Sequence, residues 1–255
     1  MITDLDAPLP GREGAATVAP GYRSSHLLSR WLVGVLLLGL AAEMAFRGTD
    51  VLLALRYPDF LDPDREPASL GEVVIGLVLL VGFVVNLVVL VLRTVLFCVW
   101  IHHAHRNAGA LGSRGMEFTP GWAVGWFFVP FANLYKPYQA VRETYLASDP
   151  DVDENDDRAM LSWHWSQRPV PVQMKLWWGT WILMNLLANV EFRASFRDDP
   201  TSRVVATWFG VAETAVAIPC TLLVVWLILE IEDRLARRHD RRRGLIASPP
   251  LEEPR

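Results

Sequence analysis

Four long apolar stretches divide this chain, and polar segments separate them. The apolar stretches cover residues 26–46, 70–101, 172–190 and 204–229. Each has roughly the 20 residues or more that a helix needs to cross the hydrocarbon core of a bilayer. The second would form a helix about 48 Å long, more than the core of ~30 Å, so it must tilt or project into water. The pattern predicts an all-α, polytopic membrane protein with four transmembrane helices.

The segments that flank these stretches differ from them in composition. Residues 1–25 are rich in proline and glycine and predict a flexible tail. Residues 233–255 form a basic tail, which leaves residues 26–232 as the four-helix membrane domain. The first apolar stretch also resembles a signal peptide, because Arg23 and Arg30 precede its apolar core. The long tail ahead of it favours a helix that is retained.

Residues 119–147 are largely apolar but contain several prolines. Pro130 ends any helix that begins near Gly121, and Pro137 can occupy the first turn of a second helix, where its missing N–H costs little. Asn133 lies in the break and can bind backbone groups that the prolines leave free. The pattern predicts an interfacial helix–break–helix, here called the central element, on the cytoplasmic surface of the membrane.

Aromatic residues support an interfacial position for the central element. Trp122 and Trp126 belong to the residue type that favours the membrane–water interface. The second helix has one apolar stripe at the spacing i, i+3 and i+7: Tyr138, Val141 and Tyr145. Glu143 is expected to point away from that stripe. Two alternatives stay open, namely an ordinary loop with aromatic anchors and a fifth transmembrane helix.

The distribution of lysine and arginine predicts the orientation in the membrane. With four spans, residues 102–171 and 230–255 carry six and seven of these cations, whereas residues 47–69 and 191–203 carry three each. Cytoplasmic segments are the richer ones, so both termini and the central element are expected in the cytoplasm. A fifth span would place the two basic segments on opposite sides, against this rule.

Net charge and cysteine content limit which partners and sites can be expected. The formal net charge of -4 gives no reason to expect a nucleic-acid partner, although the basic C-terminal tail can bind anionic lipid at the bilayer surface. Cys98 and Cys220 both lie inside apolar stretches and are expected to be buried small hydrophobic residues. They provide neither a disulfide framework nor a zinc pattern.

The predicted spans contain a few polar residues: Asn86, Arg93, Asn185, Asn189 and Glu213. Such residues usually face the bundle interior and can mark a pathway, but hydrogen bonds between helices are the favoured interpretation. Arg93 can reach the headgroups or pair inward with another residue. A direct pair with Glu213 is doubtful, because the two positions differ in depth by about 12 Å.

The sequence offers no catalytic constellation and no phosphate loop. His102, His103, His105 and His164 could together bind a transition metal, but neighbouring histidines face different sides of a helix. The acidic residues 149–157 lack the glycine and the final glutamate of an EF-hand, which favours a solvated linker. No catalytic, cofactor or metal site is therefore expected.

Three runs of residues carry a resemblance to a known family: WIHHAHRNAGALG at 100–112, PGWAVGWFFVPFANLYKPYQ at 120–139 and KLWWGTWILMN at 175–185. In these the chain resembles DUF4328, a family of bacterial membrane proteins of unknown function that occur largely in actinobacteria. The resemblance covers roughly residues 70–232. It implies a multi-helix membrane protein and supplies no catalytic residue.

These observations lead to two hypotheses for function. The first is a non-enzymatic scaffold or sensor of the cell membrane, which meets a membrane-protein partner, a second copy of the chain or lipid through its cytoplasmic face. The second is a small transporter or channel subunit that uses the polar residues of the second to fourth spans. A polar cavity between the spans would favour transport, and a dry bundle would favour a scaffold.

Overall fold

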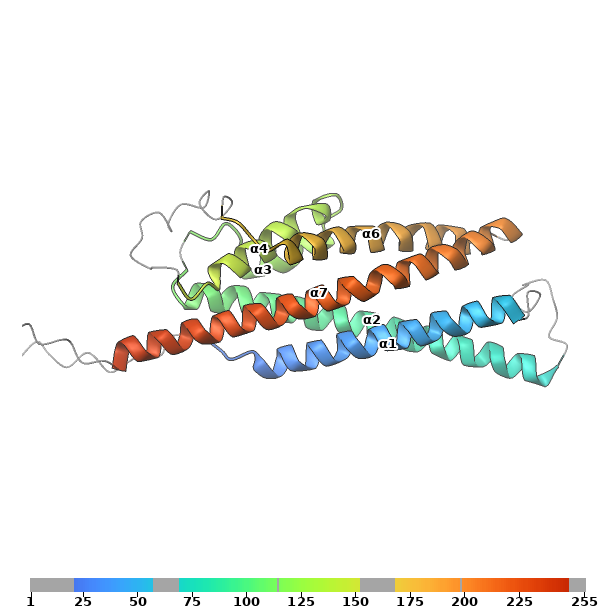
Figure 1. Ribbon diagram of the computed structural model, residues 1–255, viewed down its shortest axis with the longest axis horizontal. Coiled ribbons are helices and arrows are strands. Elements are labelled where there is room, and N and C mark those ends of the chain that lie inside the picture. The colour runs from blue at the N-terminus through green and yellow to red at the C-terminus, as the bar shows by residue number, and fades with distance from the viewer. Residues whose placement is uncertain (1–20, 57–68, 114, 152–167, 198, 248–255) are drawn as a thin grey trace, which may run out of the picture.

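The computed structural model describes residues 21–56, 69–113, 115–151, 168–197 and 199–247. Within these ranges the chain is helical and has no strand. Four long helices run along the length of the molecule (Figure 1): α1 (His26–Arg56), α2 (Leu70–Ala110), α6 (Val172–Ser195) and α7 (Pro200–Ala247). The all-α prediction is confirmed for this part of the chain.

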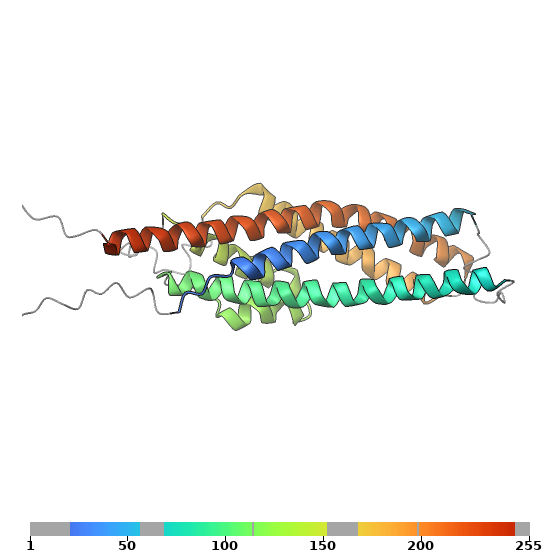
Figure 2. The ribbon, with the colours of Figure 1, turned by 90° about the horizontal axis from the view of Figure 1, so that it is seen from below.

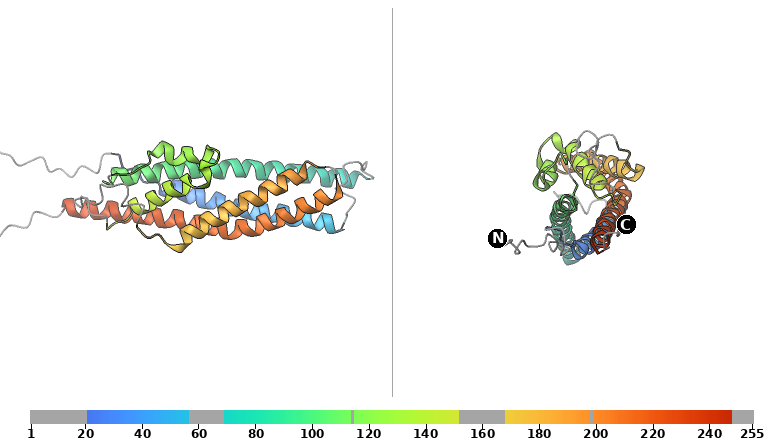
Figure 3. Two further views of the ribbon diagram at one scale, coloured as in Figure 1. Left: turned by 90° about the horizontal axis from the view of Figure 1, so that it is seen from above. Right: turned by 90° about the vertical axis from the view of Figure 1, so that its left-hand side faces the viewer.

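The long helices form a curved row rather than a closed bundle. Helix α1 lies between α2 and α7 (Figure 2), and α7 packs along α6 on its other side. Seen end-on, the row is an open arc with α2 and α6 at its two ends (Figure 3). The central element lies over the open side of this arc, at one end of the molecule.

The central element contains two helices and a break, in agreement with the prediction. Helix α3 (Pro120–Gly125) continues into the 3-10 turn η1 (Trp126–Phe128), and η2 (Ala132–Leu134) leads into α4 (Lys136–Ala147). Val129 is extended because the following proline disfavours helical backbone. Pro137 stands in the first turn of α4. The two prolines thus define where one helix ends and the next begins.

The break itself is a strained turn centred on Phe131. The φ angle of this residue is 62° and its ψ angle is -41°. The Ala132 N–H donates to the Pro130 carbonyl at 2.7 Å, which makes a γ-turn of the rare, strained kind. The Phe131 side chain is 84% exposed. The strained backbone at Phe131 thus coincides with an exposed, large apolar side chain.

Helices α1, α2 and α6 begin at the predicted residues, but all four long helices run past the expected ends. Ser69 caps α2: its hydroxyl oxygen accepts from the Glu72 N–H at 3.3 Å, one of the N–H groups without a helical partner in the first turn. At its far end α2 continues to Ala110, where Gly112 with φ 89° terminates it in left-handed backbone. Helix α7 continues to Ala247, so the expected boundary at residue 233 falls inside a helix.

Three helices of the described ranges are long and apolar enough to cross a membrane. They cover His26–Leu53, Leu70–Ala110 and Thr201–Gly244, in α1, α2 and α7. Helix α6 has 24 residues, about 36 Å of helix, but includes the charged Lys175, Glu191 and Arg193. The structure is therefore compatible with a membrane protein.

The well-packed core lies at the end that carries the central element. Its fully buried side chains include Trp100, Ile101, Val141, Met174 and Leu227, from four helices. In contrast, most apolar side chains of α2 between residues 73 and 92 are about half exposed. At the other end of the molecule, many apolar side chains of α2 are thus left uncovered.

Candidate functional site

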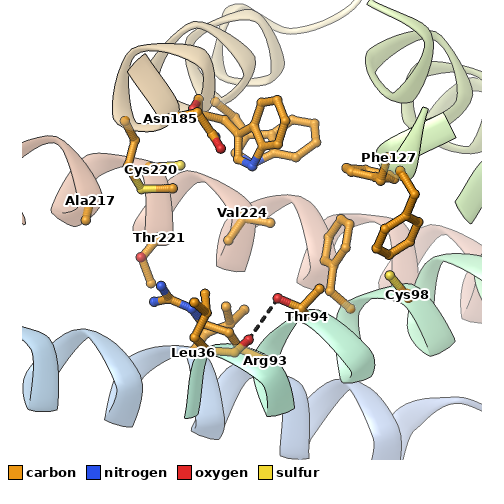
Figure 4. A pocket seen from close by; sticks show the side chains of 16 residues that line it. Leu36, Arg93, Thr94, Cys98, Phe127, Asn185, Ala217, Cys220, Thr221 and Val224 are labelled. Carbon is orange, nitrogen blue, oxygen red and sulfur yellow. Dashed lines mark hydrogen bonds between the residues drawn. The ribbon is translucent and has the colours of Figure 1, made fainter. Parts of the chain in front are cut away.

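A cavity of about 300 Å³ lies inside the arc, beside the break of the central element. Its wall includes five aromatic side chains: Phe97, Phe127, Phe128, Trp177 and Trp181. Figure 4 shows the labelled side chains around one common space, contributed by all four long helices and by η1. Sites for small molecules have volumes from about 300 to 1,000 Å³ and are lined mainly by apolar and aromatic groups. The cavity meets this description at its lower limit.

A few polar side chains line the same space. Arg93 and Thr221 lie on one side of the cavity, and Phe127 lies on the other (Figure 4). Asn185 and Thr94 complete the polar part of the wall. A small number of polar groups in an apolar cavity is the arrangement that orients a bound molecule.

The asparagines do not join the helices as expected. The Asn185 amide donates to the Trp181 carbonyl at 2.7 Å, and the Asn86 amide donates to the Gly82 carbonyl at 2.9 Å. Both acceptors lie one turn back in the same helix. The favoured interpretation, hydrogen bonds between helices, is therefore wrong for these two amide donors.

The central element closes one side of the cavity with its aromatic turn. The Phe127 ring meets the Phe97 ring edge-on at 5.6 Å and the Trp181 ring at 6.3 Å. Such T-shaped contacts are favourable beyond the area they bury. Phe127 thus links α2 to α6 across the open side of the arc. Phe97 stands four residues before Ile101, so this contact lies about 6 Å inside the predicted end of the second span.

Arg93 pairs inward with a residue that the sequence analysis did not consider. Its Nη1 lies 3.2 Å from Oε2 of Glu43 on α1, and both side chains are largely buried. Helical side chains lean towards the N-terminus of their helix, so Arg93 reaches away from Trp100. No ion pair joins Arg93 to Glu213 within the described ranges, as expected.

A second arginine extends the charged groups to α6. Nη2 of Arg47 lies 2.6 Å from Oε1 of Glu191, and Nη1 lies 3.3 Å from Oδ2 of Asp50. The guanidinium group rests against Gly210 of α7, where a Cβ atom would lie 2.3 Å from Cζ of Arg47. Glycine at this position gives the guanidinium group the space to reach Glu191.

Glu213 lies near both arginine clusters. Its carboxyl group is close to Glu43, Glu191 and Arg47. The predicted polar positions Arg93 and Glu213 therefore share Glu43 as a neighbour. The connected charged groups, here called the ion network, come from all four long helices: Glu43, Arg47, Asp50, Arg93, Glu191 and Glu213.

Sequence reasoning missed four members of the ion network for identifiable reasons. Glu43 is a single acid near the end of the first predicted span and was not counted among its polar residues. The other three are Arg47, Asp50 and Glu191. They were assigned to loops because hydropathy falls there, although α1 and α6 continue past them. An inventory of charged residues up to one turn beyond each apolar stretch would have included them.

Beyond the cavity, the central element is fixed to α2 by His105. This side chain is 2% exposed, its Nε2 lies 2.7 Å from the Phe118 carbonyl, and its Nδ1 lies 2.9 Å from the Thr144 hydroxyl. The carbonyl can only accept, so Nε2 donates the proton. The described ranges contain no group of three metal-ligating side chains, and His164 lies outside them. Through its two ring nitrogens, His105 joins α2 to the residue before the cap of α3 and to α4.

Glu143 is buried in the same contact, contrary to the expectation that it points away from the apolar stripe. It is 5% exposed and accepts from the backbone N–H groups of Glu117 and Phe118. Burial raises the pKa of this carboxyl group to about 7, although those two hydrogen bonds act to lower it. The predicted stripe places Val141 and Tyr145 in the core, and the two backbone donors explain why an acid accompanies them.

The remaining predicted positions lie around the turn. Trp122 is half exposed, and its ring lies 4.7 Å from the Trp126 ring at an interplanar angle of 33°. The Trp126 indole N–H is buried without a hydrogen-bond partner in the described ranges, while Lys136 Nζ lies 5.9 Å from that ring. Asn133 donates its backbone N–H to the Val129 carbonyl at 2.9 Å, and its side chain forms no hydrogen bond within the described ranges.

Two further buried charges hold the same end of the molecule together. Glu232 of α7 accepts from the Trp100 indole at 2.9 Å and from the Ser25 hydroxyl at 2.7 Å. Arg238 is 3% exposed and donates to the Ser113 hydroxyl at 2.6 Å and to the Ala147 carbonyl. The first turns of the expected basic tail are thus part of the packed structure.

Both cysteines, Cys98 and Cys220, line the cavity and are unpaired. Cys220 is buried and Cys98 is partly buried. Small apolar side chains at these positions leave room for the cavity, so their expected character as small hydrophobic residues fits their place in the structure.

Comparison with known proteins gives one match. The family model described as domain of unknown function (DUF4328) matches residues 63–233. No curated protein and no solved structure matches the chain. The matched residues include α2, the central element, α6 and most of α7, and therefore most of the cavity wall.

Proposed function

The chain belongs to the DUF4328 family, and from that premise and the geometry of the cavity we propose that it is a non-enzymatic sensor of the cell membrane. It binds a small amphipathic molecule from the bilayer, with the apolar part against the aromatic wall and the polar part near Arg93 and Asn185. The observation that carries this proposal is that Phe127 and Phe128 of the central element form part of the wall. Occupancy therefore acts directly on an element that faces the cytoplasm.

The proposal includes four spans, with α6 as the third of them in chain order. A helix of about 36 Å is long enough for a hydrocarbon core of ~30 Å. Helix α6 packs along α7 and exposes Leu176, Leu183 and Leu186 on its outer surface. Its charged Glu191 is paired with Arg47, which lowers the cost of placing an acid at that depth.

The proposal also places the central element at the cytoplasmic face of the bilayer, where it dips into the lipid by about one turn. Phe128, Phe131 and Leu134 are exposed, and a membrane interface would cover them. The exposed arginines at the end of α7 then lie beside anionic headgroups. The same surface is available to a membrane-protein partner or to a second copy of the chain.

We expect a photoactivatable fatty acid in liposomes to crosslink to the cavity. Ala217 lines the cavity and is 2% exposed, whereas Ala215 of the same helix is exposed. Ala217→Trp should fill the space and abolish crosslinks to Trp177, Trp181 and neighbouring residues, mapped by mass spectrometry. Ala215→Trp is the matched control and should retain them. Crosslinks that persist in Ala217→Trp, or that occur only along the lipid-exposed part of α2, would contradict the proposed site.

We expect both termini and the central element on the cytoplasmic side. In a background without Cys98 and Cys220, a cysteine at position 197 should react with an impermeant maleimide in intact cells. A cysteine at position 240 should react only after lysis, because α7 carries it to the other side. Reaction at position 240 in intact cells would overturn the four-span arrangement.

The ion network supports a second candidate function, a small transporter subunit. Arg93 belongs both to the cavity wall and to the ion network, which continues to Asp50 and Glu191 near the far ends of α1 and α6. Charged residues inside a membrane often mark a pathway. Release of the bound probe into the liposome interior, faster than in liposomes without protein, would favour this function over a sensor.

A further inference from the structure

Thr221 of α7 places a hydroxyl group at the wall of the cavity. The residue is 8% exposed, and its hydroxyl forms no hydrogen bond in the part of the chain that the structure describes. Threonine in a helix can instead donate to the carbonyl one turn back, as Thr94 does to Leu90 at 2.8 Å. The large majority of buried polar groups in proteins have a partner. The Thr221 hydroxyl is therefore available to a molecule in the cavity.

Arg93 offers further donors on the same side of the cavity. A guanidinium group carries N–H donors on each of its nitrogen atoms and has no acceptor. Nη1 engages Glu43 at 3.2 Å, whereas Nε and Nη2 form no hydrogen bond within the described ranges. The side chains of Thr221 and Arg93 point towards each other from α7 and α2 (Figure 4). This side of the cavity thus presents donors from two helices.

The other polar groups of the wall are more exposed and already engaged. The Thr94 hydroxyl donates to the Leu90 carbonyl, and the Asn185 amide donates to the Trp181 carbonyl at 2.7 Å. Both Thr94 and Asn185 are exposed residues, whereas Thr221 is buried. The deeper part of the cavity therefore requires a hydrogen-bond acceptor from its ligand.

The charges near Arg93 favour an acceptor without a charge of its own. The ion pairs of the network join three carboxyl groups to two guanidinium groups: Glu43, Asp50 and Glu191, with Arg47 and Arg93. When ionised, these groups already have an excess negative charge. A carboxylate ligand would add another in a low-dielectric region, which is costly. A neutral carbonyl oxygen accepts hydrogen bonds without that cost.

We propose that the cavity selects uncharged amphipathic molecules with a carbonyl acceptor, such as an ester or a ketone, and that Thr221 and Arg93 donate to this oxygen. The apolar remainder of the molecule lies against Phe127 and Trp181. This inference rests on the proposed function, because it specifies the ligand class of the same cavity. Thr221 then distinguishes such a ligand from a plain hydrocarbon, since a ligand without the acceptor leaves a buried donor unpaired.

Competition in liposomes tests the ligand class. The photoactivatable fatty acid is used as its methyl ester, and the competitors are a methyl ester, an ionised carboxylic acid and an alkane of equal chain length. In the wild type the ester should displace the probe at about tenfold lower concentration than the alkane, as expected for two hydrogen bonds. The acid should be a weaker competitor than the ester.

Variants of α7 assign the effect to one hydroxyl. Thr221→Val keeps the shape of the side chain and should reduce the advantage of the ester over the alkane about fivefold, the contribution of one hydrogen bond. Thr221→Ser retains a hydroxyl and should preserve the advantage. Thr214→Val is the matched control, because Thr214 is a buried threonine of α7 whose hydroxyl also lacks a partner in the described ranges but does not line the cavity.

The outcomes separate this inference from the proposed function. Equal displacement by ester and alkane in the wild type, or an unchanged advantage in Thr221→Val, would mean that the cavity binds molecules without recognising their acceptor. The proposed function would then stand and this inference would fail. Stronger displacement by the ionised acid than by the ester would overturn the conclusion on charge. If neither the fatty acid nor its methyl ester crosslinks to the cavity, both the proposed function and this inference fail.

Discussion

Arg93→Glu is expected to prevent the protein from accumulating in a folded form. The substitution places a third carboxyl group beside Glu43 and Glu213 and removes the cation that Glu43 needs. Arg93→Leu should still insert into the membrane but should lower the free energy of unfolding by about 3–5 kcal/mol, the usual cost of breaking a buried ion pair from one side. Yield of the monodisperse protein and denaturant unfolding in detergent measure the two effects.

A double variant separates the ion pair from general damage. Glu43→Leu with Arg93→Leu should recover most of the lost stability, because replacing a whole buried pair by apolar residues is often neutral. Arg56→Leu is the matched control, since Arg56 is exposed at the end of α1, and should change stability by no more than about 0.5 kcal/mol. Wild-type yield and stability for both Arg93 variants would mean that this side chain faces lipid.

Hydropathy predicted where α1, α2 and α6 begin, but it did not predict where the four long helices end. An apolar stretch indicates the part of a helix that contacts lipid or core. The helix itself continues further where polar side chains beyond that stretch pack against other parts of the chain. His105 and Arg238 lie beyond the predicted spans, and each is buried against the central element or its flanks. Those partners come from distant parts of the chain, so no local pattern marks the continuation.

The same reason explains what was missed about charge. The polar residue Arg93 could be identified in its apolar stretch, but Glu43, its partner, lies 50 residues away in sequence. The expectation that Arg93 could reach the headgroups considered one helix alone, whereas packing of α1 against α2 provides a closer acceptor. In the basic tail, the sequence shows an excess of arginine, but only the fold shows that Arg237 pairs with Asp233 and that Arg234 lies 4.0 Å from the Tyr145 ring.

The proline pattern gave the most specific local prediction, because it acts through the backbone itself. Pro130 and Pro137 fix φ and remove donors wherever they stand, so the break between α3 and α4 could be placed from sequence. The γ-turn at Phe131 could not be placed in this way, since φ near 62° is rare for a phenylalanine. The place of Phe127 and Phe128 in the cavity wall could not be predicted either, because it follows from packing of the whole element on α2 and α6.

His105→Leu is expected to release the central element from α2. The substitution keeps most of the buried volume but leaves the Phe118 carbonyl without its ring donor and removes the ring partner of Thr144. Each buried polar group left without a partner costs about 1–3 kcal/mol. Amide hydrogen exchange should therefore rise in α3 and α4 while the middle of α7 stays protected.

The neighbouring histidine provides the control for this experiment. His103 lies on the same helix end but is only partly buried, and no hydrogen bond of its side chain is found in the described ranges, so His103→Leu should leave the exchange of α3 and α4 unchanged. Equal exchange in both variants would mean that His105 does not fix the central element. Because Phe127 and Phe128 close the cavity from that element, its release by His105→Leu should also weaken crosslinking of the fatty-acid probe. Loss of protection in α3 and α4 with undiminished crosslinking would show that the cavity holds its ligand without the central element, and the sensor mechanism would fail.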